Sequence, residues 1–226
     1  IDGVSFRNGI HIGGGGDGAE FCWVRLHTDT GIVGTGETYP FHRSELGALK
    51  DYARRIIGRD PRDIDGIWRG FYHAMAMRNA GGGDIRILSA INMAQLDILG
   101  QASGLPLYRL LGGKTRPRVR VYNTATNYWA INETRMGTDT MKIYPFLANR
   151  GEGYISNRAL DEGMSWIREI RDNVGDQMDI CADCWGRFNL TSAMPIAKAL
   201  ELYNIMYLED VMLMNNAKAY AQLARE

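Results

Sequence analysis

Four polar side chains end short apolar segments in the second half of the chain, and their types suit acid–base or metal chemistry. Lys142 and Tyr144 end one segment, Asp183 ends the next, and Glu209 ends the one after that. If these segments are strands, side-chain alternation places Lys142 and Tyr144 on one face. Two carboxylates that face a shared centre from neighbouring strands suit an oxygen-liking divalent cation such as Mg²⁺. The alternative is structural: Asp183 and Glu209 cap the loops or helices that follow their strands.

The elements that must position these residues are typical of a parallel β/α sheet. Apolar segments of strand length lie at residues 119–122, 140–144, 178–182 and 205–208. Helical periodicity occupies the stretches between them, at about 160–174 and 195–203. In a βα barrel the chemistry gathers at the carboxyl ends of the strands, where the four polar residues stand.

The first half of the chain has a different pattern. Residues 20–38 alternate as an antiparallel hairpin around a turn at 29–31. Helical periodicity follows at about 44–57, 63–78 and 84–102. The fold class is therefore α/β, with an α+β domain over residues 1–115 followed by a β/α domain over residues 116–226.

Composition narrows the function classes. Lys plus Arg number 26 and Asp plus Glu number 26, so the chain is formally neutral and lacks the bulk charge that attracts nucleic acid or an anionic membrane. The chain shows neither a spanning segment nor the start of a signal peptide, and it has an odd number of cysteines, so we expect a cytoplasmic protein. Cys181 and Cys184 have CxxC spacing, but residues three apart on a strand point to opposite faces and cannot share a metal or a disulfide.

Two further stretches carry a resemblance together with the strand ends. They are the hairpin end at 29–37 and the run at 94–100 with 104–113, which reads GLPLYRLLGG. The chain resembles the enolase superfamily, and within it the mandelate racemase subgroup with its acid-sugar dehydratases. The resemblance implies a capping domain followed by a modified TIM barrel, with Mg²⁺ held by acids from the third, fourth and fifth strands. Asp183 and Glu209 occupy the first two of those places.

The chain departs from the pattern of this family at two positions. The family typically has Lys-x-Lys at the end of the second strand, and here Tyr144 stands in the second place after Lys142. An ammonium and a divalent cation nearby would favour the Tyr144 phenolate, so Tyr144 is expected to be a base or an acid, or else a wall of the substrate pocket. Trp185 stands where Asn or His is common, which excludes a base there. Lys142 and Tyr144 are thus the implied catalytic residues, and Trp185 and Asn123 the implied substrate contacts.

The barrel expected from the resemblance is incomplete in this chain. Eight strands close such a barrel, and four can be counted after residue 115. The stretch 124–138 is also short for a loop and a full crossover helix. We expect the third metal ligand and a His-Asp pair on strands beyond Glu226. The alternative is a truncated, non-catalytic relative.

The activity implied by the resemblance is Mg²⁺-dependent abstraction of the proton α to a carboxylate, with dehydration of an acid sugar to a 2-keto-3-deoxy acid sugar favoured over racemisation or epimerisation. The substrate is then a small carboxylate, the expected assembly is a homo-oligomer, and neither nucleic acid nor a membrane is a partner. The glycine runs at 13–16 and 31–36 lack the spacing of phosphate-binding loops. We interpret them as a lid loop and a hairpin turn.

Overall fold

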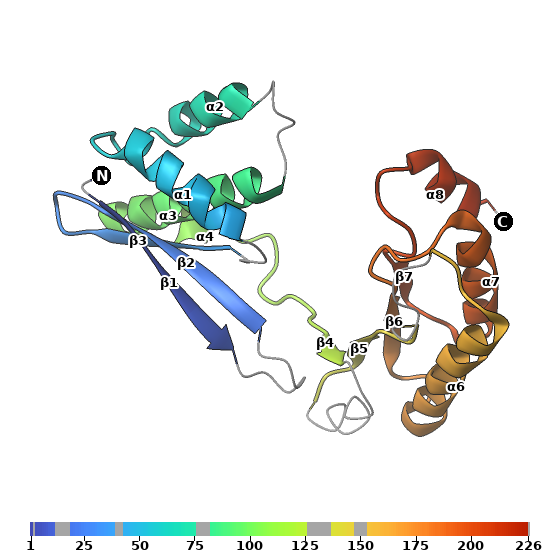
Figure 1. The fold of residues 1–226 in the computed structure, drawn as a ribbon. Coiled ribbons are helices and arrows are strands. Elements are labelled where there is room, and N and C mark those ends of the chain that lie inside the picture. Colours follow the sequence, from blue (N-terminus) through green and yellow to red (C-terminus); the bar gives the residue numbers. More distant parts are fainter. Residues whose placement is uncertain are drawn as a thin grey trace. The chain divides into compact units, whose positions relative to one another are not determined.

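In a computed structural model the chain forms two units, Ile1–Pro117 and Arg118–Glu226 (Figure 1). The structure describes residues 1, 3–11, 19–38, 43–75, 82–125, 137–146 and 153–225. The expected lid at residues 13–16 lies outside them. Within these described ranges no helix combines the length and apolar character that crossing a membrane requires.

The first unit contains a three-stranded antiparallel sheet in the order β1-β2-β3. Its strands are β1 (Gly3–His11), β2 (Ala19–His27) and β3 (Val33–Thr38). The hairpin predicted over 20–38 is confirmed as β2 and β3, while β1 was not predicted. The turn between β2 and β3 needs glycine at Gly31, whose φ is 82°, a left-handed value that side chains disfavour.

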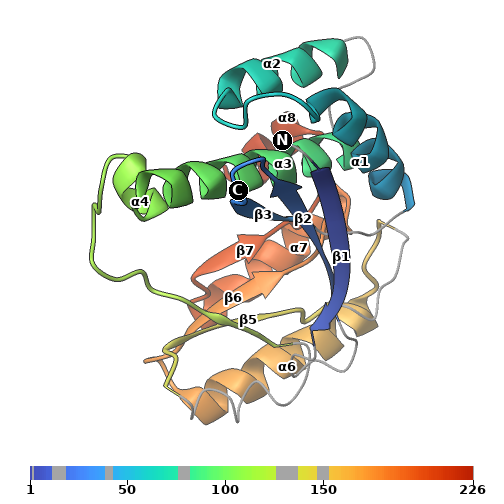
Figure 2. The ribbon, with the colours of Figure 1, turned by 90° about the vertical axis from the view of Figure 1, so that its left-hand side faces the viewer.

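Among the residues that the structure describes, four helices accompany this sheet: α1 (Arg43–Ile56), α2 (Ile64–Met75), α3 (Gly82–Ser103) and α4 (Leu107–Leu110). Helix α3 lies directly along the sheet, and α1 and α2 pack against α3 (Figures 1 and 2). The close approach depends on two glycines of β3, because a Cβ at Gly34 or Gly36 would collide with the carbonyl oxygen of Ala94 or Ala90 in α3. The glycine run at 31–36 therefore serves a turn and helix packing.

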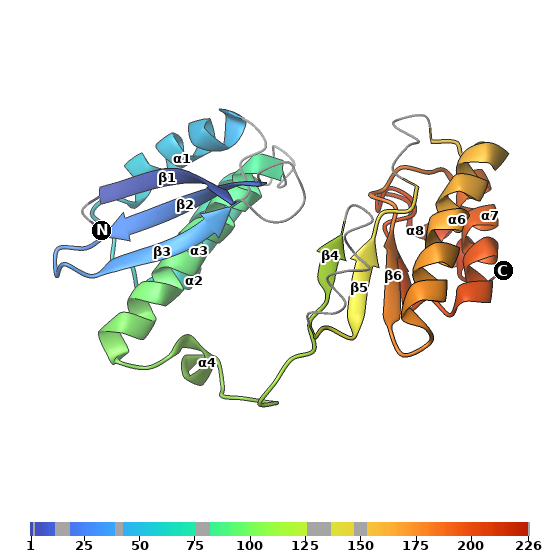
Figure 3. The same cartoon turned by 90° about the horizontal axis from the view of Figure 1, so that it is seen from below.

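The second unit is built on a four-stranded parallel sheet in the order β4-β5-β6-β7. The strands are β4 (Asn123–Ala125), β5 (Thr140–Ile143), β6 (Asp179–Asp183) and β7 (Tyr207–Glu209). Its helices are α6 (Asn157–Val174), α7 (Leu190–Leu200), the 3₁₀ turn η3 (Glu201–Tyr203) and α8 (Ala217–Leu223). Figures 1 and 3 show α6 and α7 together on one side of this sheet. The predicted βα alternation is confirmed.

The first strand of this sheet corrects the sequence-based expectation. Residues 119–122 were expected to form it, but the pairing with β5 begins at Asn123, opposite Met141. Val119 and Val121 instead remain 72 % and 65 % exposed. Their β-branched alternation is typical of a strand, yet strand position is decided by the partner that supplies the ladder.

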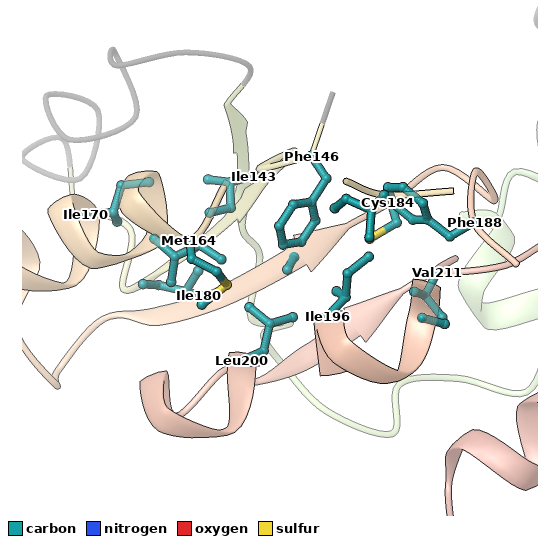
Figure 4. Packing of buried hydrophobic residues seen from close by; sticks show 14 of the residues in the cluster. Ile143, Phe146, Met164, Ile170, Ile180, Cys184, Phe188, Ile196, Leu200 and Val211 are labelled. Atoms are coloured by element: carbon teal, nitrogen blue, oxygen red, sulfur yellow. The ribbon is translucent and has the colours of Figure 1, made fainter. Parts of the chain in front are cut away.

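The hydrophobic core of the second unit lies between the sheet and its helices. Figure 4 shows Met164 of α6, Ile196 of α7 and Ile180 of β6 meeting there. Met141 and Ile143 of β5 and Ala182 of β6 belong to the same cluster. Because side chains alternate along a strand, this burial turns the intervening residues of β5 and β6 to the opposite face. That face carries the candidate site.

Candidate active site

Lys142 connects the ends of three neighbouring strands. Asp183 of β6 and Glu209 of β7 are paired in register, and Lys142 of β5 lies opposite Cys181, two residues before Asp183. The Lys142 Nζ atom is 3.0 Å from Asp183 Oδ2 and 3.2 Å from Glu209 Oε2. The structure thus brings together both expected metal ligands and one expected catalytic residue.

The cluster is enclosed, and it carries one more negative than positive charge. The side chains of Lys142 and Asp183 are only 12 % and 3 % exposed, while Glu209 is one-third exposed. Burial alone would lower the pKa of Lys142, but its interactions with Asp183 and Glu209 outweigh burial and raise that pKa. Lys142 therefore carries an ammonium group at neutral pH and cannot take up a proton.

The two carboxylates use their oxygens differently. Asp183 Oδ1 accepts a hydrogen bond from the backbone N–H of Trp185 at 2.9 Å, which leaves Oδ2 for Lys142. Glu209 Oε2 is buried and within ion-pair distance of Lys142, yet it has no aligned hydrogen bond among the described residues. A buried carboxylate oxygen without an aligned donor is suited to a cation.

Aromatic rings surround the ammonium group. The Lys142 Nζ atom lies 5.7 Å from the ring centroid of Tyr122 and 5.7 Å from that of Tyr144, within the range of a cation–π interaction. The Tyr144 ring meets the Trp185 ring edge to face at 5.7 Å. The guanidinium of Arg187 lies over the Trp185 ring, with Cζ 5.7 Å from the ring centroid. Lys142, Tyr144, Trp185 and Arg187 therefore form a continuous row.

Tyr144 differs from the expectation in its ionisation. Burial raises the pKa of Tyr144, and Lys142 lowers it by a smaller amount. The ammonium acts in the expected direction, but desolvation of the phenol outweighs it. The chain's own residues therefore keep Tyr144 as a neutral phenol, which can donate a proton.

The structure does not bring Asn123 into the cluster. Asn123 lies opposite Met141 in the ladder, on the face that packs against the helices, and its Nδ2 lies 3.3 Å from Thr138 Oγ1. The expected substrate contact of Asn123 stays a prediction. Thr124 is the residue of β4 that pairs with Lys142, and Tyr122 is the ring beside Lys142. Sequence reasoning missed Tyr122, and the register of β4 is the signal that finds it.

The cysteines take no part in this chemistry. Cys22, Cys181 and Cys184 are free and buried. Burial raises the pKa of each, and that of Cys184 reaches about 12. A thiol that stays protonated is a poor nucleophile and a poor metal ligand, which agrees with the interpretation of the CxxC spacing.

The donor set of the cluster suits a hard cation. Asp183 and Glu209 offer carboxylate oxygens, which Mg²⁺ prefers over nitrogen or sulfur ligands. Within the ranges that the structure describes, no group of three or more His, Cys, Asp or Glu side chains is gathered for a metal. The chain therefore presents two candidate ligands together.

Comparison with known families agrees with this architecture. Residues 13–112 match the family model described as mandelate racemase / muconate lactonizing enzyme, N-terminal domain. Residues 130–226 match the model described as enolase C-terminal domain-like. The chain belongs to the enolase superfamily. The capping domain and the part of a modified barrel implied by the sequence are thus shown.

Individual members of the enolase superfamily are similar over most of the chain. The D-gluconate dehydratase of Thermoproteus tenax is 33 % identical over 83 % of this chain, and the D-galactonate dehydratase of Pectobacterium atrosepticum is 31 % identical over 91 %. The crystal structure of an enolase of the mandelate racemase subgroup from Agrobacterium tumefaciens superposes over the whole chain with a TM-score of 0.84 and 32 % identity. This chain spans 40 %, 56 % and 61 % of those proteins, respectively.

Proposed function

We propose that the protein is an acid-sugar dehydratase. It removes the proton α to a carboxylate and expels the β-hydroxyl, which yields a 2-keto-3-deoxy acid sugar. The observation that carries the proposal is Lys142 held between Asp183 and Glu209 at the carboxyl ends of parallel strands. The similarity to relatives named D-gluconate and D-galactonate dehydratases favours dehydration over racemisation or epimerisation.

Asp183 and Glu209 are the residues that would hold Mg²⁺. Their oxygen chemistry fits the cation, and the buried Glu209 Oε2 has a lone pair that no described donor meets in alignment. When bound, the cation supplies positive charge to the enediolate oxygens that develop as the α-proton leaves.

Lys142 adds a second positive charge on the same face. Its ammonium stabilises the developing enediolate because the enclosed site screens charge less than water does. Tyr144, neutral and two residues further along, donates a proton to the departing hydroxyl. Trp185 presents an indole that is 59 % exposed and forms an aromatic wall for the carbon chain of the substrate.

The base that takes the α-proton is a separate group. Trp185 cannot accept a proton, and Lys142 already carries one, so neither residue can serve. We propose that this base and the third metal ligand lie on further barrel strands. We also propose that the protein assembles as a homo-oligomer and acts in the cytoplasm; light scattering tests the assembly.

Turnover in D₂O tests the proposed function. The purified protein with Mg²⁺ and D-gluconate or D-galactonate should incorporate deuterium at the α-carbon and form a 2-keto-3-deoxy acid, both of which NMR detects. Lys142→Met should lower turnover by about 10² to 10³. The matched variant Lys198→Met, at an exposed position of α7, should retain it. Deuterium exchange with inversion and without water loss would identify a racemase or epimerase, and neither exchange nor turnover with any acid sugar would refute the proposal.

A further inference from the structure

We infer that Arg187 is a positioning residue, which holds the Trp185 indole in place as a wall of the substrate pocket and so raises the affinity for substrate. The inference rests on the proposed function, because it assumes that the substrate packs against Trp185. It adds to the site a residue that sequence reasoning did not nominate. Arg187 acts through Trp185 and needs no contact with the reacting atoms.

The backbone around Trp185 forms a tight turn. Trp185 and Gly186 have φ of 56° and 68°, and the backbone N–H of Arg187 donates to the Cys184 carbonyl at 3.3 Å. Positive φ at both central residues is the pattern of a type I′ turn. The chain after β7 supports this turn, because the backbone N–H of Gly186 donates to the Asp210 carbonyl. The turn therefore presents the side chains of residues 185 and 187 from a backbone that hydrogen bonds hold.

The indole of Trp185 stands at a position that disfavours it. Turns of this type prefer Gly, Asn and Asp at their central residues, and a bulky side chain with positive φ is an outlier. Outliers of this kind cluster at functional sites. The Trp185 side chain also projects from the turn, with the residue 59 % exposed. Burial therefore does not fix the ring, and its position depends on the side chains that it meets.

The ring of Trp185 meets Tyr144 at one edge and Arg187 over its face. The Tyr144 and Trp185 centroids are 5.7 Å apart, and the rings are nearly perpendicular. The Cζ atom of Arg187 lies 5.7 Å from the Trp185 centroid, within the range of a cation–π interaction. A planar, weakly hydrated guanidinium stacks on an aromatic face better than an ammonium does. The type of residue at position 187 therefore suits the task of holding an exposed indole.

A ring that is already held loses less conformational entropy when a ligand packs against it. This pre-organisation strengthens binding without changing the chemical step. The charges that act on the reacting atoms belong to the cluster of Lys142, Asp183 and Glu209. Loss of the Arg187 guanidinium should therefore raise KM and leave kcat nearly unchanged.

Steady-state kinetics of the purified protein with Mg²⁺ and D-gluconate or D-galactonate test this split. Arg187→Met keeps the backbone N–H of the turn and an apolar stem but removes the charge, and it should raise KM by about two- to fivefold. Arg187→Lys should recover part of the affinity. The control Arg158→Met, on α6 where the side chain is 88 % exposed, should keep the KM of the unsubstituted protein. An unchanged KM in Arg187→Met, or a fall in kcat alone, would overturn the inference.

A second background separates positioning from direct contact with the substrate. Trp185→Leu removes the ring through which Arg187 is inferred to act. In that background Arg187→Met should leave KM nearly unchanged, so the two substitutions should be strongly non-additive. The same rise of KM with and without the indole would mean that Arg187 contacts the substrate itself, which would overturn the positioning role.

Fluorescence anisotropy tests the contact without a substrate. The chain has five tryptophans, so the emission of Trp185 is obtained by subtracting that of the matched Trp185→Leu variant. This emission should lose anisotropy in Arg187→Met, because the indole moves more freely, and it should keep its anisotropy in Arg158→Met. Unchanged anisotropy in Arg187→Met would overturn the inference. Failure of every acid sugar to turn over would overturn the proposed function instead, and the anisotropy would still decide whether Arg187 holds the ring.

Discussion

Replacing Asp183 by asparagine separates the charge of this residue from its shape. The carboxylate is 3 % exposed and has two partners, the backbone N–H of Trp185 at 2.9 Å and the Lys142 ammonium at 3.0 Å. An asparagine oxygen can still accept the Trp185 hydrogen bond. The ion pair is lost, and the amide NH₂ group is left facing an ammonium, which is also only a donor.

The expected loss of stability depends on the contacts that Lys142 retains in Asp183→Asn. Removing one partner of a buried ion pair costs about 3–5 kcal/mol when the surviving charge has no other partner. Lys142 keeps Glu209 at 3.2 Å and two flanking rings, so most of its compensation survives. We therefore expect Asp183→Asn to lower the free energy of unfolding by about 1–3 kcal/mol in the absence of divalent cations.

Urea unfolding of the purified protein measures this cost, and the same strand supplies the control. Asp179 of β6 pairs with Arg120 at 2.6 Å, but both side chains are well exposed. Exposed pairs contribute little to stability, so Asp179→Asn should leave the free energy of unfolding nearly unchanged. Mn²⁺ should stabilise the unsubstituted protein and Asp179→Asn, but not Asp183→Asn. Equal stability of the two variants would refute the buried ion pair, and undiminished Mn²⁺ binding by Asp183→Asn would refute its role as a ligand.

Three other variants test the packing, the ionisation and the chemistry. Gly36→Ala should lower the free energy of unfolding by about 3 kcal/mol, because its Cβ meets the backbone of α3. Gly47→Ala, in open space on α1, should raise the free energy of unfolding by about 0.5–1 kcal/mol. Equal effects of the two variants in urea unfolding would contradict the close packing of β3 against α3. Burial, followed by a hydrogen bond to Asp84, raises the pKa of Tyr52 in the folded protein. An unfolded tyrosine ionises near pH 10 while the folded Tyr52 stays protonated, so the free energy of unfolding should fall above about pH 10. Tyr52→Phe should show a shallower fall, and an identical pH profile would contradict the assignment. Tyr144→Phe should keep α-proton exchange in D₂O and lower water release by about 10², whereas a change in KM alone would make Tyr144 a pocket wall.

The sequence predicted the elements of the fold better than their pairing. Helix α3 has a long apolar period, and Gly104 with φ 65° follows its end, so local signals were sufficient. Strand β1 was missed because its evidence is a long-range ladder to β2, from Gly3 opposite His27 to His11 opposite Ala19. The first barrel strand was placed a few residues early for the same reason. Pairing depends on the partner strand, which a local pattern does not contain.

In the candidate site, too, local sequence patterns predicted the residues but not the contacts between them. Alternation and strand ends were sufficient to nominate Lys142, Asp183 and Glu209, because these depend on local periodicity. The ion pairs between them depend on which strands are neighbours and on the register of Asp183 opposite Glu209. Asn123 lies on the other face of the sheet from Lys142, because it stands opposite Met141 in the ladder. The sequence thus identified the charged residues, and the strand pairing determines which of them form ion pairs.

The backbone after the two acids supports the charged and aromatic parts of the site in different ways. Asp183 and Glu209 end paired strands, and the ladder continues past them, with the N–H of Cys184 donating to the Glu209 carbonyl at 3.0 Å. The backbone of both acids is therefore held by regular structure. Trp185 and Asp210 follow with φ of 56° and 44°, left-handed values that cost a residue with a side chain about 1–2 kcal/mol. Trp185, the proposed wall of the substrate pocket, thus stands on a strained turn next to two acids whose backbone the ladder holds.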